Sequence, residues 1–467
     1  MIRAHTVTSR DVVEAHLARI DEVNNNVNAI TVTLADSARR AADDVDRAVA
    51  DALPIGPLAG VPFTVKENID VAGSATTWGT AALAGQIASA DAPVVARLRE
   101  AGAIPLARTN MPDFAFRWHT ESSRAGHTRN PWDPDRTPGG SSGGEAVALA
   151  TGMTPLGLGN DLGGSLRIPS QMCGTAALRP TLGRVADAAV TEPSTPPLSI
   201  QLLNCQGPMA RRVADLRLAF DVLRAPDVRD PRWVPAPLDG PAPSGRITVA
   251  VVRDPHGGPL DPHVAAGINR AADWLADAGY DVLEAHPPEV GEATAAWFDV
   301  IGADMGGIWP LIQQIAGEGL MAFITRAMDS GAMSFVEQPQ QAVAWIARLR
   351  IGAAWSQFAA DHPIVLAPVC CERPWLVGDD IERVEEISTA MRMVLPVNLL
   401  GLPSCAVPVG SDGGLPQGVQ LIGARFREDL LLDAAQQIED RAPRLTPMEP
   451  RLPAEVGGVI PRHGPIG

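Results

Sequence analysis

Apolar residues near the start of the chain recur every three to four positions, which is the spacing of one face of an α-helix. Over residues 8–23 this spacing predicts an amphipathic helix, and Thr8 with Asp11 resembles a capping box at its start. Residues 34–52 show a second helical pattern, rich in Ala and studded with Asp and Arg, as a solvated outer helix would be. The chain therefore opens with two predicted helices.

The next apolar pattern has a period of two, which is typical of a β-strand. Val61, Phe63 and Val65 alternate, and Lys66 stands where this predicted strand ends. Helix and strand patterns then alternate at residues 92–102, 104–107, 210–223, 247–252, 264–278 and 282–284. This alternation predicts an α/β fold with a central, mostly parallel, mixed and twisted sheet covered by helices on both faces.

The pattern between residues 291 and 360 is largely helical and rich in Met and Trp. These side chains either fill a helical core or line an apolar substrate pocket, and the sequence leaves both interpretations open. Residues 446–467 are rich in Pro and Gly, which indicates a surface tail with little structure of its own. We expect a single domain over residues 1–445, with its core in 61–225 and 385–440.

Composition and charge restrict the class of partner. The 467 residues are 46% hydrophobic, which is ordinary for a globular protein with a large core. A net charge of -16 without any basic run argues against nucleic acid as a partner. No apolar stretch suits a signal peptide or a membrane span, so we expect a cytoplasmic protein, with a homodimer left open. The five scattered cysteines lack CxxC spacing and predict neither disulfides nor a metal site.

Two serines flanked by glycines stand within residues 136–179: Ser141 in GGSSGG and Ser165 in NDLGGSLR. Glycine costs backbone entropy on folding, so it is most useful where backbone amides approach a ligand or adopt positive φ. Two such loops in one stretch predict a functional site. A flexible linker is not favoured, because EAVALA directly after the first loop has a helical pattern.

Other interpretations of these motifs fail on their sequence context. Residues 139–143 fit G-x-S-x-G, the nucleophile elbow of α/β-hydrolases, but that motif needs a preceding strand. The three prolines in NPWDPDRTP exclude one. A phosphate-binding loop would need Gly-Lys-Ser/Thr after the glycines, and this is absent. His256 and His263 lack a third ligand nearby in sequence, so no metal site is predicted there.

Lys66 is the candidate base for a serine nucleophile. Serine reacts poorly until a base takes its proton, and Ser-Lys arrangements are an alternative to Ser-His-Asp. Lys66 ends a β-rich run, where it can be desolvated. A lysine must lose about 2 to 3 pKa units to act as a base near neutral pH. The alternative is an ordinary surface lysine paired with Glu67.

Several longer motifs resemble those of the amidase signature family. In chain order they are VKENIDVAG, TNMPDFAF, TRNPWDPDRTPGGSSGG, GNDLGGSLRIPSQMCG, GPMARRVADLRLAFDVL, PVNLLGLPSCAVPVG and GLPQGVQLIG. The resemblance extends from Ser9 to about Ile438 and leaves out only the Met- and Trp-rich middle. It implies the fold of that family and hydrolysis of a carboxylic amide, with no metal or organic cofactor.

The resemblance also implies a Ser-cisSer-Lys triad. Ser165, which follows DLGG, corresponds to the nucleophile, and Ser141, 24 positions earlier, corresponds to the bridging serine after a cis peptide. Lys66 lies in the VKxN motif. Lys66 would take a proton from Ser141, which takes one from Ser165, and water would hydrolyse the resulting acyl-enzyme through the same relay.

Further roles follow from the same resemblance. Backbone N–H groups on the glycine-rich turn would bind the oxyanion, with little reorganisation during the reaction. Neighbouring side chains would hold the turn and the relay by hydrogen bonds. The implied oxyanion donors are Leu162, Gly163, Gly164 and Ser165, and the supporting residues are Ser142, Asp161 and Arg167.

The substrate pocket is expected to differ from that of other family members. Trp118 and His119 stand in FRWHTESS, where the family more often has small residues. We expect them and Asn160 to line the pocket, and the substrate to carry a bulky apolar or aryl portion. The same acyl chemistry serves amide, ester and carbamate (urethane) bonds, so all three stay open.

The family includes a second class of function, the glutaminase subunit of tRNA-dependent amidotransferases, which hands ammonia to a partner. This chain departs from the usual pattern of that glutaminase at Asn160, Leu162 and Arg179, where Ser, Thr and Lys are typical. These differences favour a free-standing amidase, and the amidotransferase component is the alternative.

Overall fold

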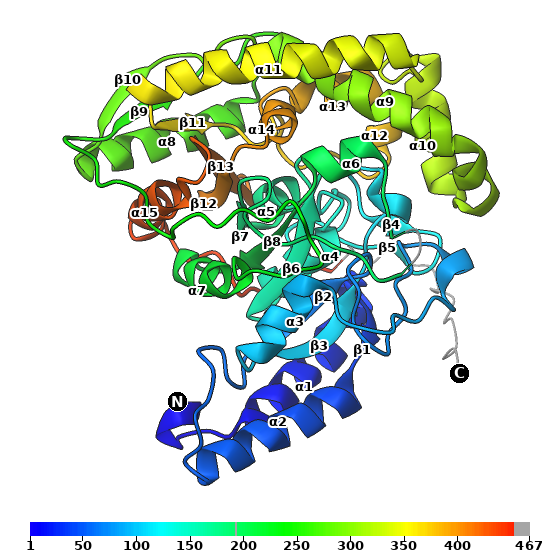
Figure 1. The fold of residues 1–467 in the computed structure, drawn as a ribbon, viewed down its shortest axis with the longest axis vertical. Helices are drawn as coiled ribbons and strands as arrows, with labels where there is room; N and C mark the ends of the chain where they lie inside the picture. Colours follow the sequence, from blue (N-terminus) through cyan, green and yellow to red (C-terminus); the bar gives the residue numbers. More distant parts are fainter. Residues whose placement is uncertain (192–193, 453–467) are drawn as a thin grey trace.

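The structure is a computed structural model that describes residues 1–191 and 194–452. In this part of the chain, a sheet of eleven strands forms the centre of the molecule (Figure 1). Across the sheet the strands are β1 (Ile30–Thr33), β3 (Ile104–Thr109), β2 (Pro62–Lys66), β6 (Leu156–Asp161), β8 (Cys205–Ala210), β7 (Ala176–Arg179), β12 (Ser404–Asp412), β13 (Leu415–Gly423), β11 (Ile364–Ala367), β9 (Thr248–Val251) and β10 (Asp281–Glu284). A separate two-stranded pair joins β4 (Glu121–Ser122) and β5 (Gly126–His127).

Strand direction changes across the sheet. β2 runs parallel to β3 and β6, and β9 runs parallel to β10 and β11. The other six neighbouring pairs of the described sheet are antiparallel, including β12 and β13, which are joined by a Gly-Gly turn. The predicted α/β class with a mixed central sheet is confirmed. Parallel pairs are fewer than expected, because helix and strand alternation along a chain does not reveal which strands become neighbours.

Two buried apolar clusters lie on opposite faces of the sheet, because successive strand residues point to opposite sides. Val249 and Val251 of β9 belong to one cluster, and Ala250 between them belongs to the other. The first face is covered by α3 (Pro93–Glu100), α7 (Val213–Leu223), α8 (Pro262–Asp277) and α15 (Glu428–Glu439). The second is covered by α1 (Ser9–Val27), α2 (Ala35–Ala50), α4 (Gly143–Ala150), α5 (Arg167–Cys173), α6 (Leu198–Leu203), α9 (Val290–Ile315), α10 (Glu318–Asp329), α11 (Gln338–Asp361), α13 (Val384–Ala390) and α14 (Leu395–Leu400), with α12 (Asp379–Glu382) against α10.

Helices α1 and α2 confirm the two predicted N-terminal helices. The Thr8 hydroxyl accepts the Asp11 N–H at 2.9 Å, and the Asp11 carboxylate accepts the Thr8 N–H at 3.0 Å, which is the predicted capping box. The first helix runs on to Val27, beyond the predicted end at Val23, because both valines are buried on the same face.

The helices α9, α10 and α11 confirm the helical pattern between residues 291 and 360 and form the outer layer at the top of Figure 1. Some of the Met and Trp side chains fill the core, and some line an apolar cavity; that this cavity binds the substrate stays a prediction. Met305 and Trp355 are buried in the core without lining a cavity. Trp297 and Met333 also line an apolar cavity, described below.

The described part of the predicted C-terminal tail has no helix or strand after α15, but it is attached to the body. The Met448 N–H donates to the Ala150 carbonyl at 2.9 Å, and the Arg451 N–H donates to the Pro131 carbonyl at 2.9 Å. Residues 453–467 of that predicted tail lie outside the described residues.

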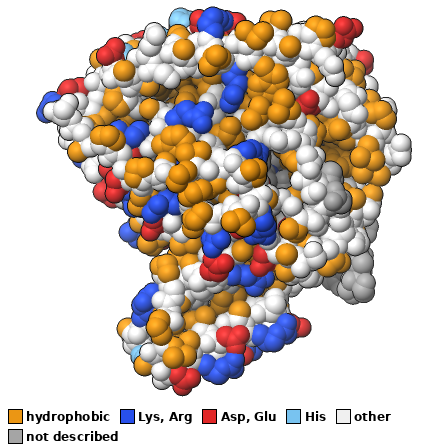
Figure 2. Space-filling view, in the orientation of Figure 1, with side chains coloured by type: hydrophobic (Ala, Val, Ile, Leu, Met, Phe, Trp, Pro, Cys, Tyr) orange, Lys and Arg blue, Asp and Glu red, His pale blue; other side chains and the backbone are white. Residues whose placement is uncertain are grey.

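Side chains of both charges are scattered among apolar ones on the face shown in Figure 2. Among the helices of the described residues, none is sufficiently long and apolar to span a membrane.

Candidate active site

Lys66, Ser141 and Ser165 come together at one edge of the sheet, where strands β2 and β6 end. Lys66 is the last residue of β2, and the parallel strand β6 ends at Asp161, just before the turn that carries Ser165. Ser141 lies in the loop that leads into α4. The carboxyl ends of parallel strands meet at one edge of a sheet, so these distant segments become neighbours.

The side chain of Lys66 is fully buried and makes two hydrogen bonds. Its Nζ donates to Ser141 Oγ at 2.7 Å and to Asn160 Oδ1 at 2.9 Å. The side-chain amide of Asn160 donates in turn to Asn68 Oδ1 at 3.0 Å. The alternative of a surface lysine paired with Glu67 is wrong, because Lys66 has no exposure to solvent.

Burial lowers the pKa of Lys66 to about 7, because the ammonium form loses its hydration. The nearby Asp161, and Glu145 when it is ionised, favour the ammonium form but do not offset this loss. Lys66 is also the only lysine in the sequence, where every other Lys or Arg position is arginine. Arginine stays protonated in proteins, so it cannot serve as a base. Because Lys66 is the only lysine, the composition alone identifies it as the one candidate for a lysine base, without any motif.

Lysine labelled with ¹³C and ¹⁵N will give a single side-chain signal in this protein, so the pKa of Lys66 can be measured by NMR. We expect a titration midpoint near pH 7, roughly three units below that of an exposed lysine, with the amine charged below it and neutral above it. A midpoint near that of a free lysine would contradict a desolvated amine.

The loop that carries Ser141 packs directly against the backbone of residues 117–119. The peptide between Gly140 and Ser141 is cis. A Cβ on Gly140 would lie 2.7 Å from the carbonyl oxygen of Arg117, so only glycine fits at this position. Ser142, expected beside the relay, donates its backbone N–H to the carbonyl oxygen of Ser165 at 3.2 Å. This bond joins the two serine loops.

Ser165 lies where two cavities meet. It is 6% exposed and lines both, whereas Ser141 lines only the larger one. No hydrogen bond joins the hydroxyls of Ser141 and Ser165 in the described part of the chain. The contact from Lys66 to Ser141 is therefore formed, and the contact from Ser141 to Ser165 is not.

The carboxylate of Asp161 holds the turn before Ser165. It accepts the N–H of Gly164 at 2.7 Å and the N–H of Leu166 at 3.3 Å. The guanidinium of Arg167 donates to the same carboxylate at 2.9 and 3.1 Å. Of the four expected oxyanion donors, the N–H of Gly164 is therefore not available, because it is already bound to Asp161.

Buried charges around this turn are compensated. Burial alone would raise the pKa of Asp161, but the guanidinium groups of Arg167 and Arg179 hold that pKa below its usual range. Arg167 also donates to Asn398 Oδ1 at 2.6 Å and to Gln420 Oε1 at 2.8 Å. The carboxylate is thus ionised, and through Arg167 it links the turn to helix α14 and strand β13.

Two tryptophans fix the peptide planes of the turn. Trp297 Nε1 donates to the Leu162 carbonyl at 3.0 Å, and Trp118 Nε1 donates to the Gly163 carbonyl at 2.9 Å. In a trans peptide the N–H points opposite to the C=O, so Trp297 also sets the direction of the Gly163 N–H. The N–H groups of Leu162, Gly163 and Ser165 have no hydrogen-bond partner among the described residues. They remain available as oxyanion donors.

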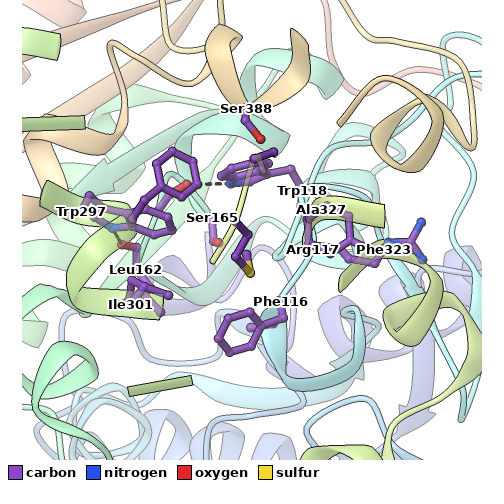
Figure 3. Close-up of a pocket in the computed structure, with 15 residues that line it drawn as sticks. Phe116, Arg117, Trp118, Leu162, Ser165, Trp297, Ile301, Phe323, Ala327 and Ser388 are labelled. Carbon is purple, nitrogen blue, oxygen red and sulfur yellow. Dashed lines mark hydrogen bonds between the residues drawn. The ribbon is translucent and has the colours of Figure 1, made fainter. Parts of the chain in front are cut away.

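The smaller of the two cavities is mainly apolar (Figure 3). Figure 3 shows Ser165 among the side chains of Phe116, Trp118 and Trp297. The other lining residues include Ile301, Phe323 and Met333. No pattern in the sequence assigned a specific role to Phe116, although it stands in the TNMPDFAF motif, or to Trp297 within the helical region.

The larger cavity is more polar and shares Phe116, Leu162 and Ser165 with the smaller one. Asn68 and Asn160 line it near the lysine, and Asp187 and Arg232 line it further out. Asn160, expected in the substrate pocket, thus both lines a cavity and orients Lys66.

His119 does not line either cavity, which corrects its expected place in the substrate pocket. Its Nδ1 lies 2.9 Å from Thr137 Oγ1, and its Nε2 lies 3.1 Å from Nδ1 of His127, on which the ring stacks. Trp118 faces the cavity, and the next side chain along the backbone points into the protein. His119 therefore supports the serine loop from behind.

Among the residues 1–191 and 194–452, no group of three or more His, Cys, Asp and Glu side chains could hold a metal ion. The five cysteines are buried free thiols.

Comparison with known proteins places the chain in a family. Residues 11–432 match the Amidase family model. Indoleacetamide hydrolase of Bradyrhizobium diazoefficiens is 41% identical over 452 residues, which cover 94% of this chain and 85% of that protein. A glutamyl-tRNA(Gln) amidotransferase subunit of Symbiobacterium thermophilum is 33% identical over 465 residues, covering 92% and 93%. The solved structure of 6-aminohexanoate cyclic dimer hydrolase superposes with a TM-score of 0.80 at 27% identity, covering 95% of both chains.

The chain therefore belongs to the Amidase family, the family of amidase signature enzymes, and it is a hydrolase of amide bonds. The family membership indicated by the sequence motifs is confirmed. The family model also covers the Met- and Trp-rich helices α9 to α11, where the motifs gave no signal.

Asp161→Asn will destabilise the fold strongly, because it leaves the guanidinium of Arg167 buried without a counter-charge. We expect a loss of about 3–5 kcal/mol in the free energy of unfolding, measured by urea denaturation. As a control, Asp433→Asn removes the exposed partner of Arg217, and should cost less than about 1 kcal/mol. Equal effects of the two substitutions would contradict the structural role of Asp161.

Proposed function

We propose that the chain hydrolyses a carboxylic amide with Ser165 as nucleophile, Ser141 as proton bridge and Lys66 as base. The observation that carries this proposal is the 2.7 Å contact between Nζ of the fully buried Lys66 and Ser141 Oγ. The lowered pKa of Lys66, about 7, supports it, because a neutral amine can accept a proton and an ammonium cannot.

In the acylation step, Ser165 Oγ forms a bond to the amide carbon while its proton moves to Ser141 and the Ser141 proton moves to Lys66. The carbonyl electrons pass to oxygen, where the N–H groups of Leu162, Gly163 and Ser165 bind the developing charge. A small approach of Ser141 and Ser165 completes the proton path, because apo sites often have loose catalytic hydrogen bonds.

Collapse of this intermediate breaks the C–N bond. Ser141 gives its proton to the leaving nitrogen and regains one from the Lys66 ammonium, which leaves an acyl group on Ser165. Water then attacks the acyl carbon and passes a proton through the same two side chains, which releases the acid and restores Ser165.

For the acyl part of the substrate we propose an arylacetic group, released from a primary amide with ammonia as the other product. The apolar cavity beside Ser165 is lined by Trp118, Trp297 and Phe323, which suit a flat apolar ring. The 41% identical relative is named an indoleacetamide hydrolase, and its substrate is of this class. Esters and carbamates with the same acyl group are secondary candidates, because the chemistry at Ser165 is the same.

The amidotransferase component stays the alternative, since a relative of that name is 33% identical. Glutamine would bring an ammonium and a carboxylate into the acyl cavity. The one charged lining residue of that cavity, among the described residues, is Arg117, whose guanidinium is already bound to Asp380 and Glu121. An unpaired charge is costly in such a place, so the cavity favours an uncharged acyl group. A cytoplasmic location and a homodimer stay predictions.

Ser165→Ala should lower kcat by about 10⁴-fold or more, because no other group forms the covalent bond. Ser141→Ala and Lys66→Ala should each lower kcat by about 10²–10⁴-fold, because the nucleophile loses its base. Steady-state hydrolysis of an arylacetamide is the measurement. Ser170→Ala, at a buried serine on α5 outside both cavities, is the control and should stay within about twofold. Full activity of Lys66→Ala would exclude the relay.

Indole-3-acetamide and phenylacetamide should exceed acetamide in kcat/KM by about 100-fold or more, since burial of the ring contributes binding energy in the transition state. Ile301→Trp should fill the apolar cavity and remove most of this preference, as measured by kcat/KM on the same three amides.

Leu311→Trp is the matched control, because Leu311 lies on the same helix α9 with its side chain exposed. Preference for acetamide would exclude an aryl pocket. Hydrolysis of glutamine that requires a second protein would favour the amidotransferase alternative instead.

A further inference from the structure

Glu145 is a fully buried acid beside the site, and the proposed mechanism does not use it. It lies in the first turn of α4, directly after the Ser141 loop. Its Oε2 lies 2.5 Å from Thr64 Oγ1, and its Oε1 lies 2.8 Å from Thr109 Oγ1. A Cβ on Gly157 of strand β6 would overlap Oε2, so the sheet leaves room for this carboxyl group.

The two threonines place Glu145 next to Lys66. Thr64 comes two residues before Lys66 on strand β2, so their side chains point to the same face of the sheet. Thr109 is the partner of Lys66 in the register between β2 and β3. The carboxyl group of Glu145, which contacts both threonine hydroxyls, therefore lies close to the side chain of Lys66.

The charged groups that face Glu145 are Lys66 on β2 and Arg108 on β3. Neither forms an ion pair with it in the described part of the chain. Arg108 donates instead to the carbonyl oxygens of Val65, Lys66 and Ile69, among other acceptors. The further acid near Lys66, Asp161 on β6, is paired with Arg167. Glu145 is thus a buried carboxyl group without a cation of its own.

The side-chain contacts of Glu145 provide no charged partner. Both of its oxygens lie near threonine hydroxyls, and no N–H group or cation binds them within the described residues. A hydroxyl can donate to a carboxylate or accept from a carboxylic acid, so burial without a cation decides which form is present. The N-terminus of α4 favours the ionised form. Burial outweighs this and raises the pKa of Glu145 to about 8.

We infer that Glu145 is a protonated, uncharged positioning residue that keeps the amine of Lys66 neutral near physiological pH. An ionised carboxylate at this place would attract a proton to Lys66 and remove the base. The two groups titrate as a coupled pair, in which the lysine loses its proton first. This inference rests on the proposed role of Lys66 as the base.

The first test compares the NMR titration of the single lysine in the unchanged protein and in Glu145→Gln. Glutamine is neutral and has the shape of a protonated glutamic acid, so we expect the Lys66 midpoint to move by less than about 0.5 unit. A second small change of the lysine signal above about pH 8, caused by ionisation of Glu145, should disappear. A fall of the Lys66 midpoint by about one unit or more would show that the carboxylate was ionised, and would overturn the inference.

A second measurement needs neither turnover nor the lysine signal. The infrared difference spectrum between the unchanged protein and Glu145→Gln, at about pH 6, should contain the carbonyl stretch of a protonated carboxylic acid. Glu14→Gln is the control: Arg39 and Arg10 bind this carboxylate and lower its pKa to about 2, so its removal should take away carboxylate bands only. Carboxylate bands alone in the Glu145 spectrum would overturn the inference. If Lys66→Ala were fully active, the relay would fail while both measurements on Glu145 kept their meaning.

Discussion

The site depends on a lysine that is buried without a counter-charge. In the described residues, Nζ of Lys66 meets a hydroxyl and an amide oxygen, both neutral, and no carboxylate forms an ion pair with it. An ion pair there would stabilise the ammonium and leave no base. The unfavourable burial of an amine is therefore part of the proposed mechanism, and the rest of the fold supplies the stability that offsets it.

The turn before Ser165 differs from the lysine, since its buried carboxylate is paired with a guanidinium group. Asp161 is ionised and bound by Arg167, and two indole N–H groups hold the carbonyls of the turn. The same tryptophans, Trp118 and Trp297, also form walls of the apolar cavity. The shape of the cavity and the geometry of the proposed oxyanion site are consequently coupled, because a movement of either ring changes both.

Much of the fold and of the site could be predicted from local sequence. The capping box of Thr8 and Asp11 involves residues three apart, and the strand that ends at Lys66 shows its own alternation. In both serine loops, the glycines that the backbone geometry needs stand directly beside Ser141 or Ser165 in the sequence. Such features depend on neighbours within a few positions, so a single sequence contains them. Composition alone also points to Lys66, because it is the only lysine in the sequence.

The sequence by itself determined the α/β class, the family and the three residues of the proposed relay, because periodicity and motifs are local. Only the tertiary structure decided the order and direction of the strands, the place of His119 behind the serine loop, and the binding of the Gly164 N–H by Asp161. It alone also brought Trp297 and Glu145 to the site. These outcomes depend on contacts between segments far apart in the chain, and the free energy of such contacts is set by packing and burial.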